Sequence, residues 1–337
     1  MTEPPPISRG AARELTPNRL VETLNVLGVY ILVAALFATG CGISGKFLTA
    51  ENLLNALRAV TLMGIVAVGV AFITYSRHYV DLSIPGIMAL SGTVAVWALQ
   101  YGIAASLAAG LAVGLVIGLI NGVVVGCLRL NPIIWTLAMM SELSGVIRWA
   151  YAGRQIYPDE ATAAGRAFLD LYHHAVFGVV PLPVVILAIV AVAGHAVMRH
   201  GGYGAALKLT GSNYEVARLS GVCVKRVVAW AFVISSLTSG VAGILLTSFN
   251  KVGAVYIGDG YDFKTITAVV LGGMTLAGGR GNVAGVIGGV MAIALMSNEM
   301  SLVGIGQFQQ NIVQGAVFIL VVGINSFLRR KAGRDDA

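Results

Sequence analysis

The segment Ile103–Cys127 reads IAASLAAGLAVGLVIGLINGVVVGC and contains no charged residue. As a helix rising about 1.5 Å per residue, it is long enough to cross the ~30 Å hydrocarbon core of a membrane. Small residues let helices approach closely in lipid, so we expect its glycines to pack against a neighbouring helix; a glycine stripe that faces a pore is the alternative. These glycines recur at every fourth position and share one helix face: Gly110, Gly114, Gly118, Gly122 and Gly126.

The composition of the whole chain agrees with this segment. Hydrophobic residues make up 57% of the 337 residues and charged residues only 11%, whereas soluble domains carry roughly 25% charged residues. This composition excludes a soluble enzyme, a secreted disulfide scaffold and a disordered chain. The formal net charge of +7 does not indicate nucleic-acid binding, because membrane proteins concentrate Lys and Arg on their cytoplasmic side.

Hydrophobic runs separated by polar loops predict an all-α membrane protein with about ten transmembrane helices. With both termini in the cytoplasm, most of the Lys and Arg residues fall in the cytoplasmic loops, as the positive-inside rule requires. The predicted parts are a cytoplasmic tail (1–23), a transmembrane permease domain (24–328) with a cytoplasmic segment (199–226), and a second tail (329–337). The predicted spans are Leu24–Ile43, Ala59–Ser76, Ile84–Gln100, Ile103–Cys127, Ile133–Tyr151, Val176–Met198, Val227–Phe249, Thr265–Gly278, Asn282–Ser297 and Ile312–Leu328.

Two parts of the chain resemble each other weakly. Asp81 precedes a short apolar segment and then the glycine-rich span, and Asp262 precedes a short segment and then a second span with glycines. The predicted topology puts Asp81 inside and Asp262 outside. Units of opposite orientation are common in transporters, so an inverted repeat is possible, although glycine-rich apolar sequences resemble one another easily.

Few polar residues occur in or beside the predicted spans, and these are the candidates for a solute pathway. Glu142 lies near the middle of the fifth span, where an ionisable group is costly unless it is paired or hydrated. It either lines a water-filled pathway, or is protonated or bonded to a neighbouring backbone. Asn121 either faces the pathway or forms a hydrogen bond between helices. Asp81, Ser83 and Thr136 are the remaining candidates.

The longest interior cytoplasmic stretch, 199–226, contains the sequence GSNYEVARLSGV (Gly211–Val222). Ser212 or Asn213 can cap a short helix that Gly221 ends. Glu215 and Arg218 are spaced to pair along one side of this helix. Because so short a helix is unstable alone, it needs either its own transmembrane helices or a second protein to pack against.

The chain lacks sequence signatures of catalysis. The only approximation to a phosphate-binding loop, Gly40 to Phe47, has Phe47 in place of the required hydroxyl residue. No metal-ligand spacing, nucleophile motif or cofactor fingerprint occurs. We therefore expect no catalytic residue, no metal site and no cofactor in this chain, so that energy for transport enters through another subunit or through an ion gradient.

Four stretches carry a resemblance to a known family. They are Asp81–Gly86, Asn131–Leu137, Gly211–Val222, and Ala268–Gly273 followed by Gly278–Gly281. In this order they are similar to the motifs D-L-S-V-G, P-F-I-x-T-L, G-x-N-x-x-A-A-x-x-S-G-I, and A-V-V-L-G-G with G-G-x-G. The chain thus resembles the permease subunits of the ribose-type, monosaccharide-importing ABC transporters of bacteria.

The resemblance implies a multi-pass protein of the bacterial inner membrane with the type II ABC importer fold. It also implies several partners: ATPase subunits that bind ATP and Mg²⁺, a periplasmic or lipid-anchored sugar-binding protein, a second permease copy or paralogue, membrane lipid, and no nucleic acid. An ion-gradient-driven secondary carrier or a solute channel acting alone is the alternative. On the resemblance, the residues coupling the chain to the ATPase are Gly211, Asn213, Glu215, Ala217, Arg218 and Gly221.

Overall fold

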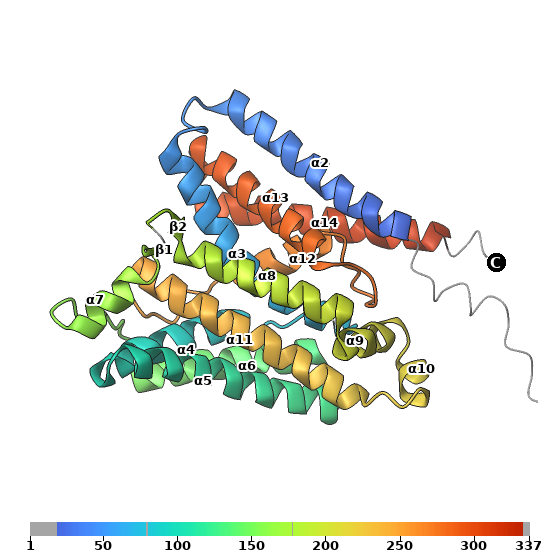
Figure 1. Ribbon diagram of the computed structural model, residues 1–337, viewed down its shortest axis with the longest axis horizontal. Helices are drawn as coiled ribbons and strands as arrows, with labels where there is room; N and C mark the ends of the chain where they lie inside the picture. The colour runs from blue at the N-terminus through green and yellow to red at the C-terminus, as the bar shows by residue number, and fades with distance from the viewer. Residues whose placement is uncertain (1–18, 79, 177, 333–337) are drawn as a thin grey trace, which may run out of the picture.

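The computed structural model describes residues 19–78, 80–176 and 178–332, and in these ranges the chain is a bundle of helices (Figure 1). The predicted tails 1–23 and 329–337 lie largely outside the described residues. The longer helices are α2 (Arg19–Ile43), α3 (Ala50–Tyr75), α4 (Ile84–Trp97), α5 (Ile103–Gly122), α6 (Pro132–Ala150), α8 (Leu182–His200), α11 (Val224–Asn250), α13 (Val283–Leu302) and α14 (Gln307–Ala332).

The shorter elements connect these helices. A 3-10 turn, η1 (Ala98–Tyr101), extends α4, and a π-helical turn, η2 (Val123–Cys127), extends α5. Strands β1 (Ala175–Val176) and β2 (Val180–Pro181) form a small antiparallel hairpin in which Ala175 lies opposite Pro181. The remaining short helices are α7 (Ala163–Asp170), α9 (Gly202–Ser212), α10 (Tyr214–Leu219) and α12 (Tyr261–Leu271).

Each predicted span overlaps a helix, and seven helices in the described ranges are long and apolar enough to cross a membrane. α6, α12 and α14 are not among the seven. For α12 the difference from the predicted span Thr265–Gly278 has a clear cause. The helix stops at Leu271 because Gly272 caps it and Gly273 takes a positive φ of 86°, which leaves it too short to span alone.

Two short helices were not expected from the apolar pattern. α7 is capped by Thr162, whose Oγ1 accepts a hydrogen bond from Gly165 N at 3.0 Å. α9 follows α8 directly after Gly201. Both lie outside the long apolar runs, so hydrophobic periodicity alone did not reveal them; the Thr162 cap was the available signal.

The glycine stripe of α5 packs against α11, which confirms the packing interpretation. A Cβ built on Gly114 would lie 2.7 Å from the Ser236 carbonyl oxygen, and one on Gly122 would lie 2.6 Å from that of Ala229. α11 also lies against α3 and α4. The core of the bundle is therefore built around α11, and the seam between α5 and α11 is one where backbones approach closely.

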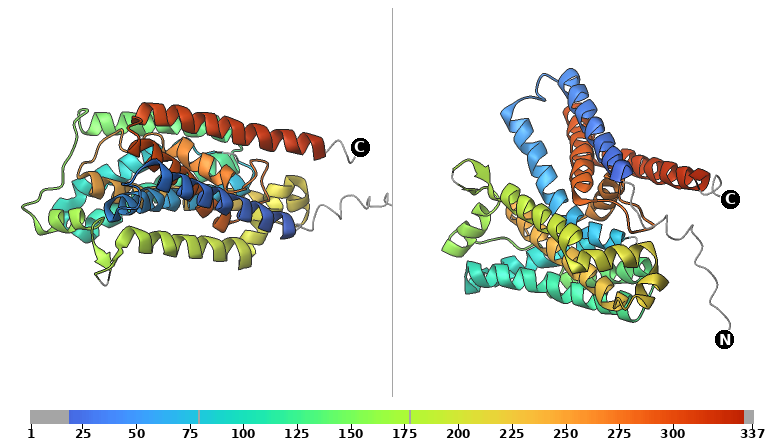
Figure 2. Two further views of the ribbon diagram at one scale, coloured as in Figure 1. Left: turned by 90° about the horizontal axis from the view of Figure 1, so that it is seen from above. Right: turned by 45° about the vertical axis from the view of Figure 1, so that its right-hand side comes forward.

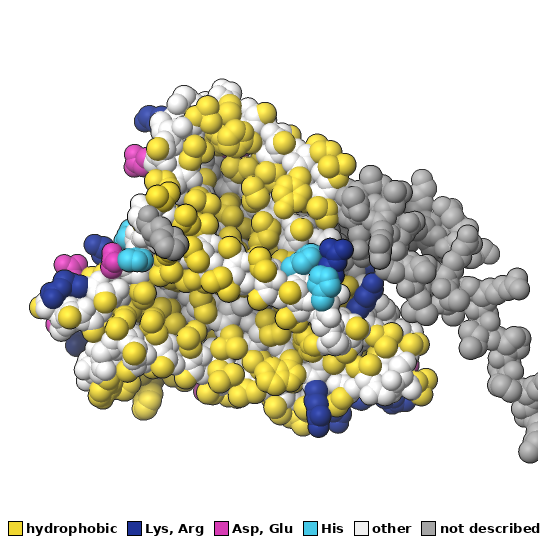
Figure 3. Space-filling model, in the orientation of Figure 1, with side chains coloured by type: hydrophobic (Ala, Val, Ile, Leu, Met, Phe, Trp, Pro, Cys, Tyr) yellow, Lys and Arg dark blue, Asp and Glu magenta, His cyan; other side chains and the backbone are white. Residues whose placement is uncertain are grey.

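The surface has the pattern of a membrane protein. Hydrophobic side chains cover the middle of the face in Figure 3, and the charged side chains gather toward its two ends. α7, β1 and β2 lie at one end, and α9 and α10 lie at the other (Figure 1). We call these the hairpin end and the coupling end.

Candidate translocation site and coupling segment

Four of the five predicted pathway residues lie together in a buried polar cluster between α4, α5 and α6. Ser83 donates through its backbone N (2.9 Å) and through Oγ (2.5 Å) to Asp81 Oδ1. Asn121 Nδ2 donates to Ser83 Oγ at 3.0 Å. Thr136 Oγ1 accepts from Leu82 N at 2.9 Å. All four side chains are fully buried, so hydrogen bonds inside the chain account for most of their polar atoms.

The exception in this cluster is the second oxygen of Asp81. Asp81 Oδ2 is buried and has no hydrogen-bond partner among the described residues. Burial raises the pKa of Asp81 to about 6, the hydrogen bonds from Ser83 oppose the shift, and the negative charge of Asp262 adds to it. Asp81 lies in the loop before α4 with an acceptor that is free for a further partner.

The start of α12 lies beside the start of α4. A Cβ on Gly258 would be only 2.6 Å from the Pro85 carbonyl oxygen, so the loop before α12 crosses directly over the first turn of α4. From here α12 runs toward the coupling end, where the loop after it meets the end of α3, while α4 runs toward α7. Asp81 and Asp262, which the predicted topology put on opposite sides of the membrane, therefore lie near each other at the starts of two helices that run in opposite directions; a span count from charges could not show that both helices begin inside the bundle.

Glu142 lies apart from this cluster, on the exposed face of α6. α6 and α14 lie on the same side of the molecule, opposite α8 (Figure 2, left). This α6–α14 face combines acidic groups with large apolar side chains. Asp259 lies beside Arg148 of α6: burial raises the pKa of Asp259, and the nearby guanidinium opposes this rise. Its exposed apolar side chains include Ile134, Leu137, Trp149, Phe308, Ile312 and Ile319.

The helix predicted within residues 199–226, which we call the coupling segment, is present as α10. Asn213 caps it by accepting from Val216 N at 3.1 Å, and Gly221 follows it with a positive φ of 80°. Arg218 and Glu215 pair at 3.0 Å, and both side chains are exposed. Ala217 is fully buried against the bundle, whereas Leu219 is 81% exposed.

Close contacts fix this segment to the rest of the chain. Gly211 ends α9, and a Cβ there would be 2.6 Å from Gly279 N. Gly279 N donates to the Tyr75 carbonyl at 2.9 Å at the end of α3. The Arg129 guanidinium stacks over the Tyr214 ring at 5.2 Å. The segment around α10 therefore contacts the end of α3, the loop after α12 and the α5–α6 loop.

The sequence did not identify Trp135 and Asp262 as residues of the site. Trp135 Nε1 donates to Asn121 Oδ1 at 2.9 Å and completes the cluster. Asp262 lies close enough to raise the pKa of Asp81. Both stood in stretches already singled out, Trp135 in the second motif and Asp262 in the repeat, but neither carried a signal that distinguished a pathway residue from a packing residue. Among the described residues, no three His, Cys, Asp or Glu side chains gather as a metal site.

Comparison with known proteins identifies the chain at the level of its family. Residues 52–322 match the family described as branched-chain amino acid transport system, permease component. The chain belongs to this family. The resemblance to sugar-type ABC permeases is also confirmed, because this permease is 31% identical to the ribose import permease protein of Bacillus subtilis (strain 168), over 88% of this chain and 90% of the relative.

Two further relatives carry the names of other pentose systems. The permease is 28% identical to the xylose transport system permease protein of Escherichia coli (strain K12), over 93% of this chain and 95% of the relative. It is 30% identical to the L-arabinose ABC transporter permease protein of Azospirillum brasilense, over 92% and 90% of the two chains. No solved structure matches the chain.

Proposed function

We propose that this chain is the membrane permease of a bacterial ABC importer and moves a monosaccharide or a related small polar solute into the cytoplasm. The observation that carries the proposal is the near-full-length similarity to ribose, xylose and L-arabinose permeases. The chain holds no ATPase site of its own. A separate ATPase subunit binds ATP and Mg²⁺, and a periplasmic or lipid-anchored binding protein delivers the solute.

The proposed topology has ten spans, with both termini and the coupling segment in the cytoplasm. The placement of α9 and α10 at one end, and of α7 with the β-hairpin at the other, supports this orientation (Figure 1). The meeting of α4 and α12 at their first turns, with opposite directions, supports an inverted repeat. α6, α12 and α14 complete the ten spans by packing against neighbouring helices and against a second subunit.

A second permease copy or a paralogue packs on the α6–α14 face. A carboxylate facing lipid in the middle of a span costs several kcal/mol, yet Glu142 is exposed on α6. A face that holds Glu142, Asp259 and Trp149 is better suited to a solute pathway between two subunits than to lipid. Glu142 therefore lines the pathway, and Asp81, Ser83, Asn121 and Thr136 form its inner wall.

ATP-driven closure of the ATPase subunits acts on α10. Asn213 and Gly221 hold the ends of this helix, Ala217 anchors it, and Glu215 and Arg218 meet the ATPase. Gly211 transmits the motion to the end of α3 and to the loop after α12. The coupling works because closure favours one arrangement of the permease over the other by several kcal/mol.

Deletion of the gene tests the solute class. The expected result is loss of high-affinity uptake of a single sugar among ribose, xylose and L-arabinose, and recovery when the intact gene is returned. The family description names branched-chain amino acids, so leucine uptake is the matched control. Loss of leucine uptake with all sugar uptake intact would overturn the sugar assignment.

A further inference from the structure

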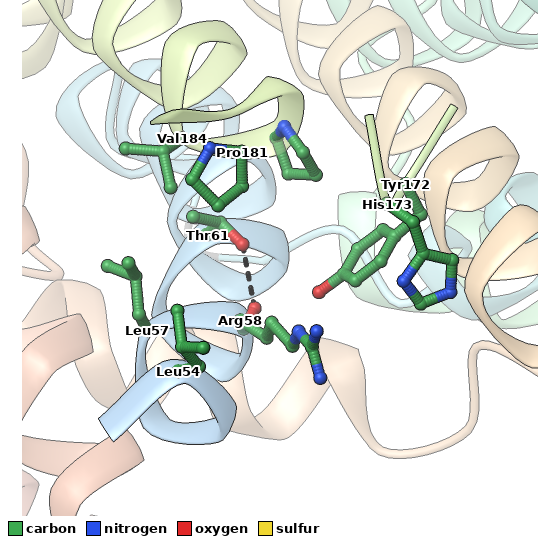
Figure 4. Close-up of a pocket in the computed structure, with 9 residues that line it drawn as sticks. Leu54, Leu57, Arg58, Thr61, Tyr172, His173, Pro181 and Val184 are labelled. Carbon is green, nitrogen blue, oxygen red and sulfur yellow. Dashed lines mark hydrogen bonds between the residues drawn. The ribbon is translucent and has the colours of Figure 1, made fainter. Parts of the chain in front are cut away.

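A recess opens at the hairpin end between the first turns of α3, the loop after α7 and the start of α8 (Figure 4). Its cavity volume is about 40 Å³, so it admits one small group of a ligand that extends beyond its mouth. Leu54 and Leu57 at its edge are 44% and 37% exposed, so the recess communicates with the outside of the bundle. Its lining residues are Leu54, Leu57, Arg58, Thr61, Tyr172, His173, Pro181, Pro183 and Val184.

The polar part of the recess is rich in hydrogen-bond donors. Arg58 donates to Asn55 Oδ1 at 3.0 Å and has no ion pair among the described residues. Tyr172 is only 2% exposed, and its hydroxyl lies beside Arg58 and close enough to Thr61 for a weak interaction, but it makes no hydrogen bond of good geometry within the described ranges. No carboxylate lines the recess. A buried hydroxyl without a well-placed partner is costly. A tyrosine hydroxyl can donate or accept, whereas the neighbouring guanidinium can only donate, so an acceptor satisfies both groups and an anionic oxygen fits best.

The apolar part of the recess indicates what kind of anion the recess accommodates. Leu54 and Leu57 belong to α3 and Val184 to α8, and both helices are long and apolar enough to span a membrane. The recess therefore combines donors at a helix end with apolar walls that continue along spanning helices. A free phosphate would gain nothing from these walls, whereas a phospholipid places its phosphate at the membrane boundary and its acyl chains just below.

We propose that Arg58 and Tyr172 bind the phosphate of an anionic phospholipid, whose acyl chains lie along Leu54, Leu57 and Val184. Arg58 supplies the charge and two further donors for the phosphate oxygens, and the Tyr172 hydroxyl donates a third bond from inside the recess. The lipid joins α3, α8 and the loop after α7 at the hairpin end. This site is separate from the polar cluster and from α10, so it does not depend on the function proposed above.

Native mass spectrometry of the full chain in detergent, titrated with phosphatidylglycerol, tests the site. The intact protein is expected to bind one molecule tightly. Arg58→Gln should weaken this binding by at least about tenfold, because it removes the charge and leaves only amide donors, and Tyr172→Phe should weaken it several-fold without disturbing packing. Arg154→Gln, which changes an exposed arginine at the same end, should leave it unchanged.

Two companion titrations distinguish the ligand source. Diacylglycerol, which has the same acyl chains without phosphate, should not bind saturably, and inorganic phosphate should not displace phosphatidylglycerol. Equal affinity of the intact protein, Arg58→Gln and Tyr172→Phe for phosphatidylglycerol would overturn the site. Full displacement by inorganic phosphate would overturn its assignment to lipid.

Discussion

α5 and α6 follow one another in the chain, and each carries a glycine in its second half, Gly118 and Gly145. The surroundings of these two glycines are opposite. A Cβ on Gly118 of α5 would lie 2.8 Å from the Cα of Val233 in α11. A Cβ on Gly145 of α6 would have no neighbour within 4 Å. The packing of α5 is thus completed inside the chain, whereas α6 presents a small residue, next to Glu142, to the outside. The difference separates the helices that hold the fold from the face where we place a second subunit.

The largest effect is expected from Gly118→Leu. The new side chain would meet the α11 backbone, which cannot move aside as a side chain can, so we expect a loss of stability of at least about 3 kcal/mol. Size-exclusion chromatography and thermal unfolding in detergent should detect little folded protein. A well-folded Gly118→Leu variant would contradict the claim that close packing of α5 against α11 holds the fold.

Arg218→Glu extends the comparison to the coupling end, where the exposed pair is expected to meet the ATPase. ATP hydrolysis stimulated by solute and binding protein should be lost, while the subunits still assemble. The double variant Glu215→Arg with Arg218→Glu restores an opposite-charge pair within α10 and is the control for helix stability. Recovery of stimulation in this double variant would show that the pair only stabilises the helix.

Gly145→Leu is the matched counterpart of Gly118→Leu. Because none of the described residues lies within 4 Å of a Cβ built on Gly145, thermal stability of the separated chain should be unchanged. Association with the second permease subunit should weaken by about tenfold, which corresponds to about 1.4 kcal/mol. Light scattering in detergent measures the association. Unchanged association and unchanged transport would place the second subunit elsewhere.

Asp81→Asn gives the smallest change. Burial raises the pKa of Asp81 from 3.8 to about 6, so the folded chain binds this proton more tightly than the unfolded chain. Stability therefore falls as the pH rises from about 4 to about 6 and stays lower above that range. Asp81→Asn should unfold at a higher temperature than the intact protein at pH 7.5 and at an equal one near pH 4, while solute uptake slows. If the unfolding temperatures of Asp81→Asn and the intact protein change identically with pH, Asp81 does not titrate in this range.

The sequence was sufficient for features that depend on local pattern. The four-residue glycine spacing predicted that α5 packs through one face, and a cap at Ser212 or Asn213 together with Gly221 predicted α10, for which the structure selects Asn213. What the stripe packs against was not predictable, since the choice of α11 depends on contacts distant in the chain. The clustering of Asp81, Ser83, Asn121 and Thr136 was likewise out of reach, because a list of polar residues in separate spans does not tell which of them meet.

The position of Glu142 was also not predictable, because it too depends on contacts between residues distant in the chain. Its position in a span predicted a functional role, but not whether it would join the polar cluster or face outward. Four predicted pathway residues meet inside the chain, and Glu142 does not. Its role on the α6–α14 face stays a prediction.

Uptake by proteoliposomes tests most directly whether this permease is a passive gate driven by a separate ATPase. Vesicles containing the permease, its ATPase and its binding protein should accumulate the solute only when ATP is present on the ATPase side, and vesicles with the permease alone should not accumulate it. Accumulation against a concentration gradient by the permease alone, driven by an ion gradient, would contradict the account.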